Sequence, residues 1–157
     1  MTATDTRSTN RSLLGPALAA GAAATVLVLV GTYLDTPWKI PGDQEWALTT
    51  DQHGLGAGLA GLAFVAAGVA VVFGVVVARG MRGRAGTEAI QSLVLAGVGV
   101  LSAVVFWTGL PMILAAGSTV LALDARARLG RTPVPAGIAL ALAALTTVAA
   151  INLAFTG

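Results

Sequence analysis

The chain has 157 residues, of which 56% are hydrophobic and only 10% are charged, and its mean hydropathy is +0.86. Soluble domains carry about 25% charged residues, so this composition excludes an ordinary water-soluble domain and indicates that a lipid bilayer is the main solvent. The absence of cysteine excludes a disulfide scaffold and a cysteine-ligated metal site, while one histidine and a net charge of +2 argue against histidine-based catalysis and nucleic-acid binding.

The N-terminal region is predicted to hold a short cytoplasmic tail and a first membrane span. Residues 1–12 are polar, and residues 13–157 are expected to form a single transmembrane helical domain. The apolar block 13–34 is long enough as a helix to cross a hydrocarbon core of about 30 Å. A cleaved signal peptide is the alternative, but its apolar region is shorter and ends at a small-x-small site. We therefore expect a retained span.

Residues 35–53 are predicted to form the main outer loop, because prolines and a glycine interrupt this stretch. Its aromatic residues are expected to anchor the chain at the headgroup level; they are Tyr33, Trp38 and Trp46. Its polar candidates for contact with an outside partner are Asp43, Glu45, Asp51 and His53. An Asp-x-His pair without a second histidine or cysteine is a weak metal signal, so we predict no metal site. Solvated charges that keep the loop out of the bilayer explain the same residues.

The second apolar block, 55–78, is predicted to be a span that ends at a glycine-rich turn. This turn carries Arg79, Arg82 and Arg84. Thr87 is expected to cap the next helix, and the carboxylate of Glu88 suits the positive end of that helix.

Residues 89–123 carry no charge and would make one helix of about 52 Å, which is too long for a single crossing. A break is predicted at Gly109 and Pro111, which gives spans over 89–107 and 110–124. The alternative is a re-entrant hairpin of two half-helices, which other helices would have to cover. An arginine-rich turn is expected to follow, and then a last span over 135–155.

The basic residues predict the topology, because eight of the nine fall on one side of these five spans and only Lys39 falls on the other. The positive-inside rule places the eight in the cytoplasm. The sequence thus predicts an all-α, polytopic bundle of about five transmembrane helices, with the N-terminus inside and the C-terminus outside. The preference for arginine, alanine, glycine and valine suggests a GC-rich bacterial genome. The expected location is therefore a bacterial cytoplasmic membrane.

Small residues recur at a seven-residue spacing and are candidates for close helix packing, which lets backbones approach in lipid. The candidates are Gly54, Gly58, Gly61 and Gly68 in the second span and Ala136, Ala143 and Ala150 in the last. Chance is the alternative explanation in a chain so rich in alanine and glycine.

No ionisable side chain falls in the middle of a predicted span, and no catalytic motif is present in the sequence. We therefore expect a small non-enzymatic membrane protein without a cofactor, acting through helix–helix contacts as an accessory, assembly or scaffold subunit. Its expected partners are membrane lipids and either another membrane protein or further copies of itself. The alternatives are a small oligomeric permease or channel for a neutral or lipophilic solute, and a lipid-modifying enzyme that uses the outer-loop carboxylates.

Overall fold

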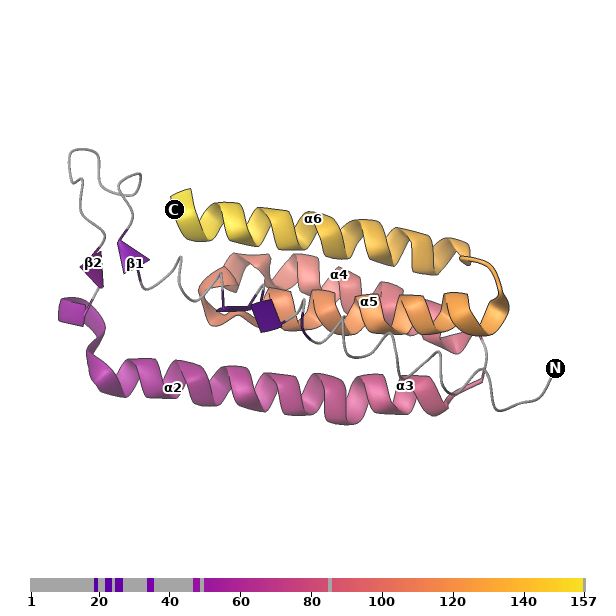
Figure 1. The fold of residues 1–157 in the computed structure, drawn as a ribbon, viewed down its shortest axis with the longest axis horizontal. Coiled ribbons are helices and arrows are strands. Elements are labelled where there is room, and N and C mark those ends of the chain that lie inside the picture. The colour runs from indigo at the N-terminus through magenta and orange to yellow at the C-terminus, as the bar shows by residue number, and fades with distance from the viewer. Residues whose placement is uncertain are drawn as a thin grey trace.

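The computed structural model describes residues 19, 22–23, 25–26, 34–35, 47–48, 50–84 and 86–156. In chain order the elements are β1 (Leu34–Asp35), β2 (Ala47–Leu48), α2 (Thr50–Val71), η1 (Val72–Val77), α3 (Ala78–Arg82), α4 (Thr87–Leu101), η2 (Ser102–Thr108), α5 (Leu110–Leu129) and α6 (Val134–Thr156). Helices dominate this part of the chain, and β1 and β2 form only a two-residue antiparallel pair (Figure 1). The all-α prediction is confirmed at this level.

Four stretches of helix are long and apolar enough to cross a membrane: Ala63–Arg82, Thr87–Val105, Leu110–Leu129 and Val134–Phe155. Large hydrophobic side chains are exposed along the outward sides of α4 and α6, as expected for helices whose solvent is lipid. These features point to a multi-pass membrane protein. The predicted first span, 13–34, lies almost wholly outside the described residues, so the count of five and the orientation stay predictions.

Helix α5 is the centre of the bundle. It packs against α4 and α6, which also pack against each other, and it lies between α6 and the helix formed by α2, η1 and α3 (Figure 1). In α5, 67% of the span-forming window is buried, compared with 17% in the window of Ala63–Arg82. The bundle is therefore a tight three-helix core with a more exposed fourth element beside it.

The outer loop ends earlier than predicted, because α2 begins at Thr50. Asp51 and His53, assigned to the loop up to residue 53, lie in the first turn of this helix. The glycines that follow do not interrupt the helix, which continues through η1 and α3 to Arg82. We call this continuous helix, residues 50–82, the rod.

The segment η1 changes the face that the rod turns toward α5. It is a π-helix, in which backbone hydrogen bonds span five residues in place of four. Val72, Val77 and Gly80 are buried, whereas Arg79 is exposed. Two turns of regular α-helix cover about seven residues, so without this segment Arg79 would lie below Val72 on the inward face.

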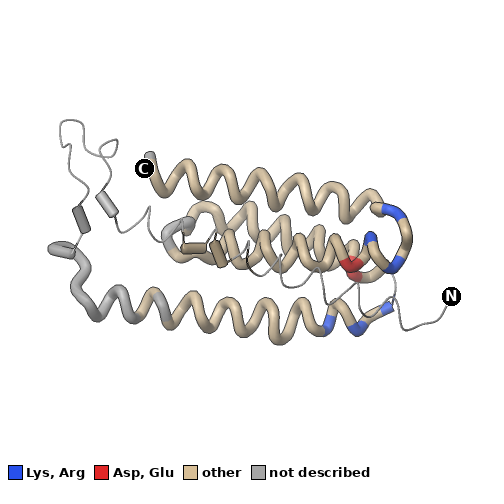
Figure 2. Tube along the Cα trace, viewed as in Figure 1, with Lys and Arg blue, Asp and Glu red and all other residues tan. Residues whose placement is uncertain are grey.

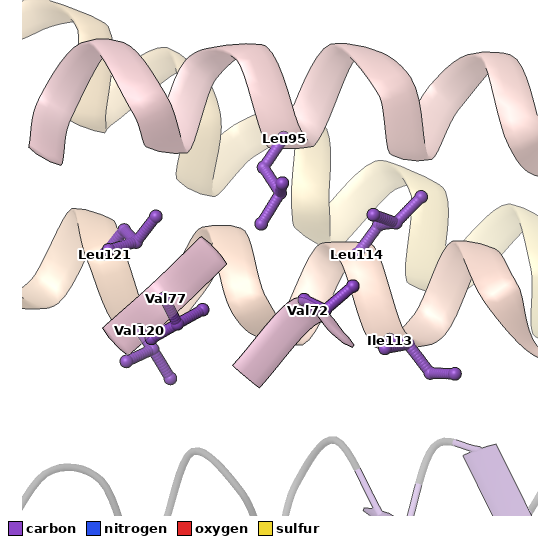
Figure 3. Packing of buried hydrophobic residues seen from close by; sticks show 7 residues of the cluster. All are labelled: Val72, Val77, Leu95, Ile113, Leu114, Val120 and Leu121. Atoms are coloured by element: carbon purple, nitrogen blue, oxygen red, sulfur yellow. The ribbon is translucent and has the colours of Figure 1, made fainter. Parts of the chain in front are cut away.

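The main apolar core forms where η1, α4 and α5 meet (Figure 3). Its buried side chains are Val72, Val77, Leu95, Ile113, Leu114, Val120 and Leu121. Two smaller clusters join α5 to α6, one around Met112, Ala150 and Ala154 and one that unites α4, α5 and α6 through alanines. Alanine on facing helices lets the three backbones approach closely.

The long uncharged block forms two helices, and its halves differ from the predicted bounds. Regular α4 ends at Leu101 and passes into the 3₁₀ segment η2, which is kinked at Val105 (φ −112°, ψ 42°). The hydroxyls of Ser102 and Thr108 donate to carbonyl oxygens three residues back. Gly109 has a φ of 71°, in the left-handed region that favours glycine, and Pro111 lies in the first turn of α5.

Helix α5 extends to Leu129, five residues beyond the predicted end at 124. Asp124, Arg126 and Arg128 therefore lie on the last turns of a helix and not in a connecting turn. The polar composition of this stretch misled the prediction, since no helix-breaking residue occurs before Gly130. Gly130 ends the helix with a φ of 65°.

Candidate functional site

The charged residues whose side chains the structure describes lie at one end of the bundle (Figure 2). The α3–α4 and α5–α6 connections both lie at this end, while α6 finishes at the other end (Figure 1). The described charged side chains there are Arg79, Arg82, Arg84, Glu88, Asp124, Arg126, Arg128 and Arg131. The antiparallel helices thus bring two arginine-rich sequence segments together.

Arg128 is the centre of this end. Its Nη1 lies 2.7 Å from Oε1 of Glu88, and its Nε lies 3.0 Å from Oδ2 of Asp124. The same guanidinium donates to the carbonyl oxygens of Gly83, at 3.1 Å, and of Met81. We call this set of contacts the Arg128 clasp, and it joins the end of α3, the start of α4 and the end of α5.

Both carboxylates of the clasp are buried: the side chain of Glu88 is 0% exposed and that of Asp124 is 2% exposed, against 27% for Arg128. A buried carboxylate is costly unless it is paired and hydrogen-bonded. Arg128 supplies a charge to both, and Oε2 of Glu88 also accepts a hydrogen bond of 2.8 Å from the backbone N–H of Gly86. The clasp is therefore a structural ion-pair network built on helix ends.

The start of α4 differs from the predicted cap at Thr87. The residue in the cap position is Gly86, with a φ of 101°, and the Thr87 hydroxyl donates back to the carbonyl oxygen of Arg84. The Glu88 carboxylate accepts a hydrogen bond from the backbone N–H of Gly86 and so does part of the work of a capping side chain. Glu88 also lies in the first turn, where the helix dipole favours a negative charge.

Buried hydroxyls between the described helices donate to backbone carbonyls. Ser118 on α5 donates to the carbonyl oxygen of Ser92 on α4 at 2.9 Å, while Ser92 and Thr146 each bond within their own helix. Oε1 of Gln91 is buried and has no hydrogen-bond partner among the described residues. These hydroxyls stabilise local backbone and connect two helices.

The packing candidates on α6 lie at the helix interface. Ala136, Ala143 and Ala150 are buried, and Ala150 packs beside Met112. On the rod, a Cβ atom at Gly68 would lie 3.2 Å from Cδ1 of Ile113. Gly61 is half-buried. Gly54 and Gly58 lie on α2, but their packing falls outside what the structure describes.

Two glycines that the sequence analysis did not single out make the closest approaches. A Cβ atom at Gly117 would lie 2.7 Å from Cγ1 of Val72 and 2.9 Å from Cδ2 of Leu95. A Cβ atom at Gly80 would lie 2.6 Å from both Leu121 and Gln91. Gly117 falls in a run of small residues, which is a usable sequence signal, whereas Gly80 lies among arginines and resembled part of a turn.

Most of the outer-loop candidates lie outside the described residues: Tyr33, Trp38, Asp43, Glu45 and Trp46. Asp51 and His53 have a described backbone but no described side chain. Among the described residues, no three histidine, cysteine, aspartate or glutamate side chains come close enough to hold a metal ion.

The site therefore consists of the Arg128 clasp, which joins the ends of three helices, and of exposed arginines at the same end of the bundle. Comparison of the chain with protein-family models, with curated proteins and with solved structures finds no match.

Proposed function

We propose that this multi-pass membrane protein is non-enzymatic and acts through helix–helix contacts, as an accessory, assembly or scaffold subunit. The proposal includes a bacterial cytoplasmic membrane as its location, with the arginine end in the cytoplasm. The observation that carries it is the outward side of the rod, where small residues lie in a line at helical spacing.

This line consists of Ala63, Ala67, Ala70 and Gly74, all of which are exposed. No described side chain or backbone atom lies within 4 Å of a Cβ atom placed on Gly74. Small residues let another helix approach closely, which is a main source of attraction between helices in lipid. The rod thus offers a surface on which a further helix can pack.

The outward side of α4 makes the contrast. Its exposed line is Ile90, Val94, Val98 and Leu101, all large side chains. Such a surface keeps a neighbouring backbone at a distance and suits contact with acyl chains. The rod's exposed side also carries Phe64, Val71 and Val75, so its small residues form one line within a mixed surface, whereas the exposed line of α4 contains no small residue. This difference supports a contact role for the rod.

The buried polar groups favour the contact role over the permease alternative. The hydroxyls of Ser92, Ser118 and Thr146 are all engaged with backbone carbonyls. The described ionisable side chains lie at one end of the bundle (Figure 2). Ion-coupled transport usually places ionisable groups within the spans.

The test compares the rod with α6. We expect the full chain in mild detergent to have a mass above the 15.6 kDa of one copy, or to retain a second protein at fixed stoichiometry. The double variant Ala67→Leu/Ala70→Leu should shift the particle to a single chain. The matched control Ala141→Leu/Ala144→Leu, at exposed positions of α6, should leave the mass unchanged.

A particle of one chain only, in both mild detergent and lipid nanodiscs, would contradict the proposal. A liposome flux assay over a broad panel of neutral solutes tests the alternative. Flux that is lost on substitution of Thr119 or Gln91 would establish the permease in its place.

A further inference from the structure

Five exposed arginines surround the Arg128 clasp and take no part in it. Arg79 and Arg82 lie on α3, Arg84 lies in the connection to α4, Arg126 lies on the last turns of α5, and Arg131 follows that helix. All five are exposed, and they share one end of the bundle (Figure 2). This end of the bundle is therefore rich in exposed arginines, and we call these five residues the arginine surface.

The described acidic side chains at this end do not neutralise the arginine surface. Glu88 and Asp124 are buried, and both are paired with Arg128. The fold thus places the negative charges inside and leaves five positive charges outside. The described residues at this end carry six arginines against two carboxylates, a net charge of +4, compared with +2 for the whole chain.

The position of the arginine surface indicates what it contacts. It lies where Ala63–Arg82 and Leu110–Leu129 end and where Thr87–Val105 and Val134–Phe155 begin. Exposed large hydrophobic side chains lie directly beside it: Ile90 on α4, Leu129 on α5 and Val134 on α6. A partner here meets apolar side chains and guanidinium groups together. Phospholipids have that combination, with acyl chains attached to a phosphate, whereas nucleic acids and acidic peptides lack the long acyl chains.

The Arg128 clasp also fixes the two parts of the arginine surface relative to each other. By accepting hydrogen bonds from Arg128, the carbonyls of Met81 and Gly83 hold the α3–α4 connection against α5. Arg82 and Arg84 are the chain neighbours of these carbonyls. The basic groups from two distant sequence segments are therefore arranged before any ligand arrives, which reduces the entropy that binding would cost.

We propose that the arginine surface binds the headgroups of anionic phospholipids in the adjacent leaflet. Guanidinium groups form paired hydrogen bonds with phosphate oxygens, and anionic headgroups add a long-range attraction. The proposal holds whichever side of the membrane this end occupies. It is independent of the proposed helix-contact function, because it concerns a different surface.

The experiment titrates the purified full chain in mild detergent with dioleoyl-phosphatidylglycerol and with dioleoyl-phosphatidylcholine, and counts bound lipids by native mass spectrometry. We expect tighter binding of the phosphatidylglycerol, with a difference that shrinks as salt is raised. Removal of one arginine near the surface is worth about fivefold in affinity. The variant Arg79→Gln/Arg82→Gln/Arg84→Gln should therefore lose at least about tenfold for phosphatidylglycerol and little for phosphatidylcholine.

Four controls separate this proposal from simpler explanations. The charge-preserving variant Arg79→Lys/Arg82→Lys/Arg84→Lys should retain most of the preference, and Lys39→Gln, in the predicted outer loop, should retain all of it. Circular dichroism should show unchanged helicity in every variant, since the substituted side chains are exposed. Inorganic phosphate at millimolar concentration should compete weakly, because it lacks acyl chains.

Three results would overturn the proposal. The first is equal affinity of the wild-type chain for the two lipids. The second is an unchanged preference in a folded glutamine variant. The third is full competition by inorganic phosphate, which would identify the surface as a site for free phosphate.

Discussion

The α4–α5–α6 core and the rod are both helical, but different contacts hold them. In the core, alanines such as Ala122, Ala136 and Ala150 are fully buried, and they bring three helices together along much of their length. The rod contacts α5 at separate points, around Gly68, Val72 and Gly80. Small residues inside the core thus bring helices together, while the small residues on the outward side of the rod are exposed.

The largest expected effect comes from removing the group that connects the two regions. Arg128→Met would leave the buried carboxylates of Glu88 and Asp124 without their cation and would release the end of the rod. Removing one partner of a buried ion pair costs about 3–5 kcal/mol. We expect a loss near the lower value, because Arg128 is partly exposed, measured as unfolding of the purified chain in detergent.

A triple variant tests whether this loss arises from the unpaired charges. Arg128→Met combined with Glu88→Gln and Asp124→Asn removes the cation and both carboxylates together. This variant should recover part of the lost stability. If it is no more stable than Arg128→Met alone, lost side-chain packing and not uncompensated charge explains the effect.

A smaller effect is expected at Gly117, where the core meets the rod. In Gly117→Ala, the new methyl group would lie 2.7 Å from the stiff, branched side chain of Val72. Overpacking of this kind costs about 1–3 kcal/mol. Gly97→Ala on α4 is the matched control, because a Cβ atom there meets nothing within 4 Å. If Gly117→Ala is as stable as this control, the side chains of Val72 and Leu95 can move aside at no measurable cost, which would contradict the prediction.

The smallest effect is expected on the rod itself. Gly80→Ala presses on the flexible ends of Leu121 and Gln91, so we expect a loss of about 1 kcal/mol, at the low end of the range for overpacking. Gly74→Ala, on the exposed side, should gain about 0.5–1 kcal/mol, because alanine favours the helix. Thermal unfolding of the two variants side by side measures the difference between the two faces of the rod. Equal shifts would contradict the assigned faces.

Much of the helical architecture could be predicted because it depends on local sequence. Long apolar blocks predict helices of membrane-spanning length, and the Gly109–Pro111 pair lies where one block divides into two helices. The end of α5 was predicted too early, because charged residues such as Arg126 resemble a turn until the position of Gly130 is considered. The start of α2 was missed because Asp51 and His53 are compatible with either a loop or a first helical turn.

The candidate site was less predictable because it depends on tertiary contacts. Glu88 and Arg128 are 40 residues apart, and neither carries a sequence motif that pairs them. From the sequence, Glu88 is explained by the helix dipole and Arg128 by the membrane topology. Both physical arguments apply to the structure, but only the packing of α3, α4 and α5 reveals that these side chains meet. The close approach at Gly80 depends on the same packing.

The π-helical segment has a consequence for which changes in chain length the rod tolerates. Each residue advances an α-helix by about 100°, and the wider turns of η1 absorb one residue more than a regular α-helix would hold between Val72 and Gly80. Deleting one residue between Val72 and Val77 would let this segment form regular α-helix and would leave Gly80 inward, whereas regular α-helix at the present length would turn Arg79 toward Leu121. The rod can therefore lose one residue within η1 and keep the same face toward α5, but it cannot become regular α-helix at its present length.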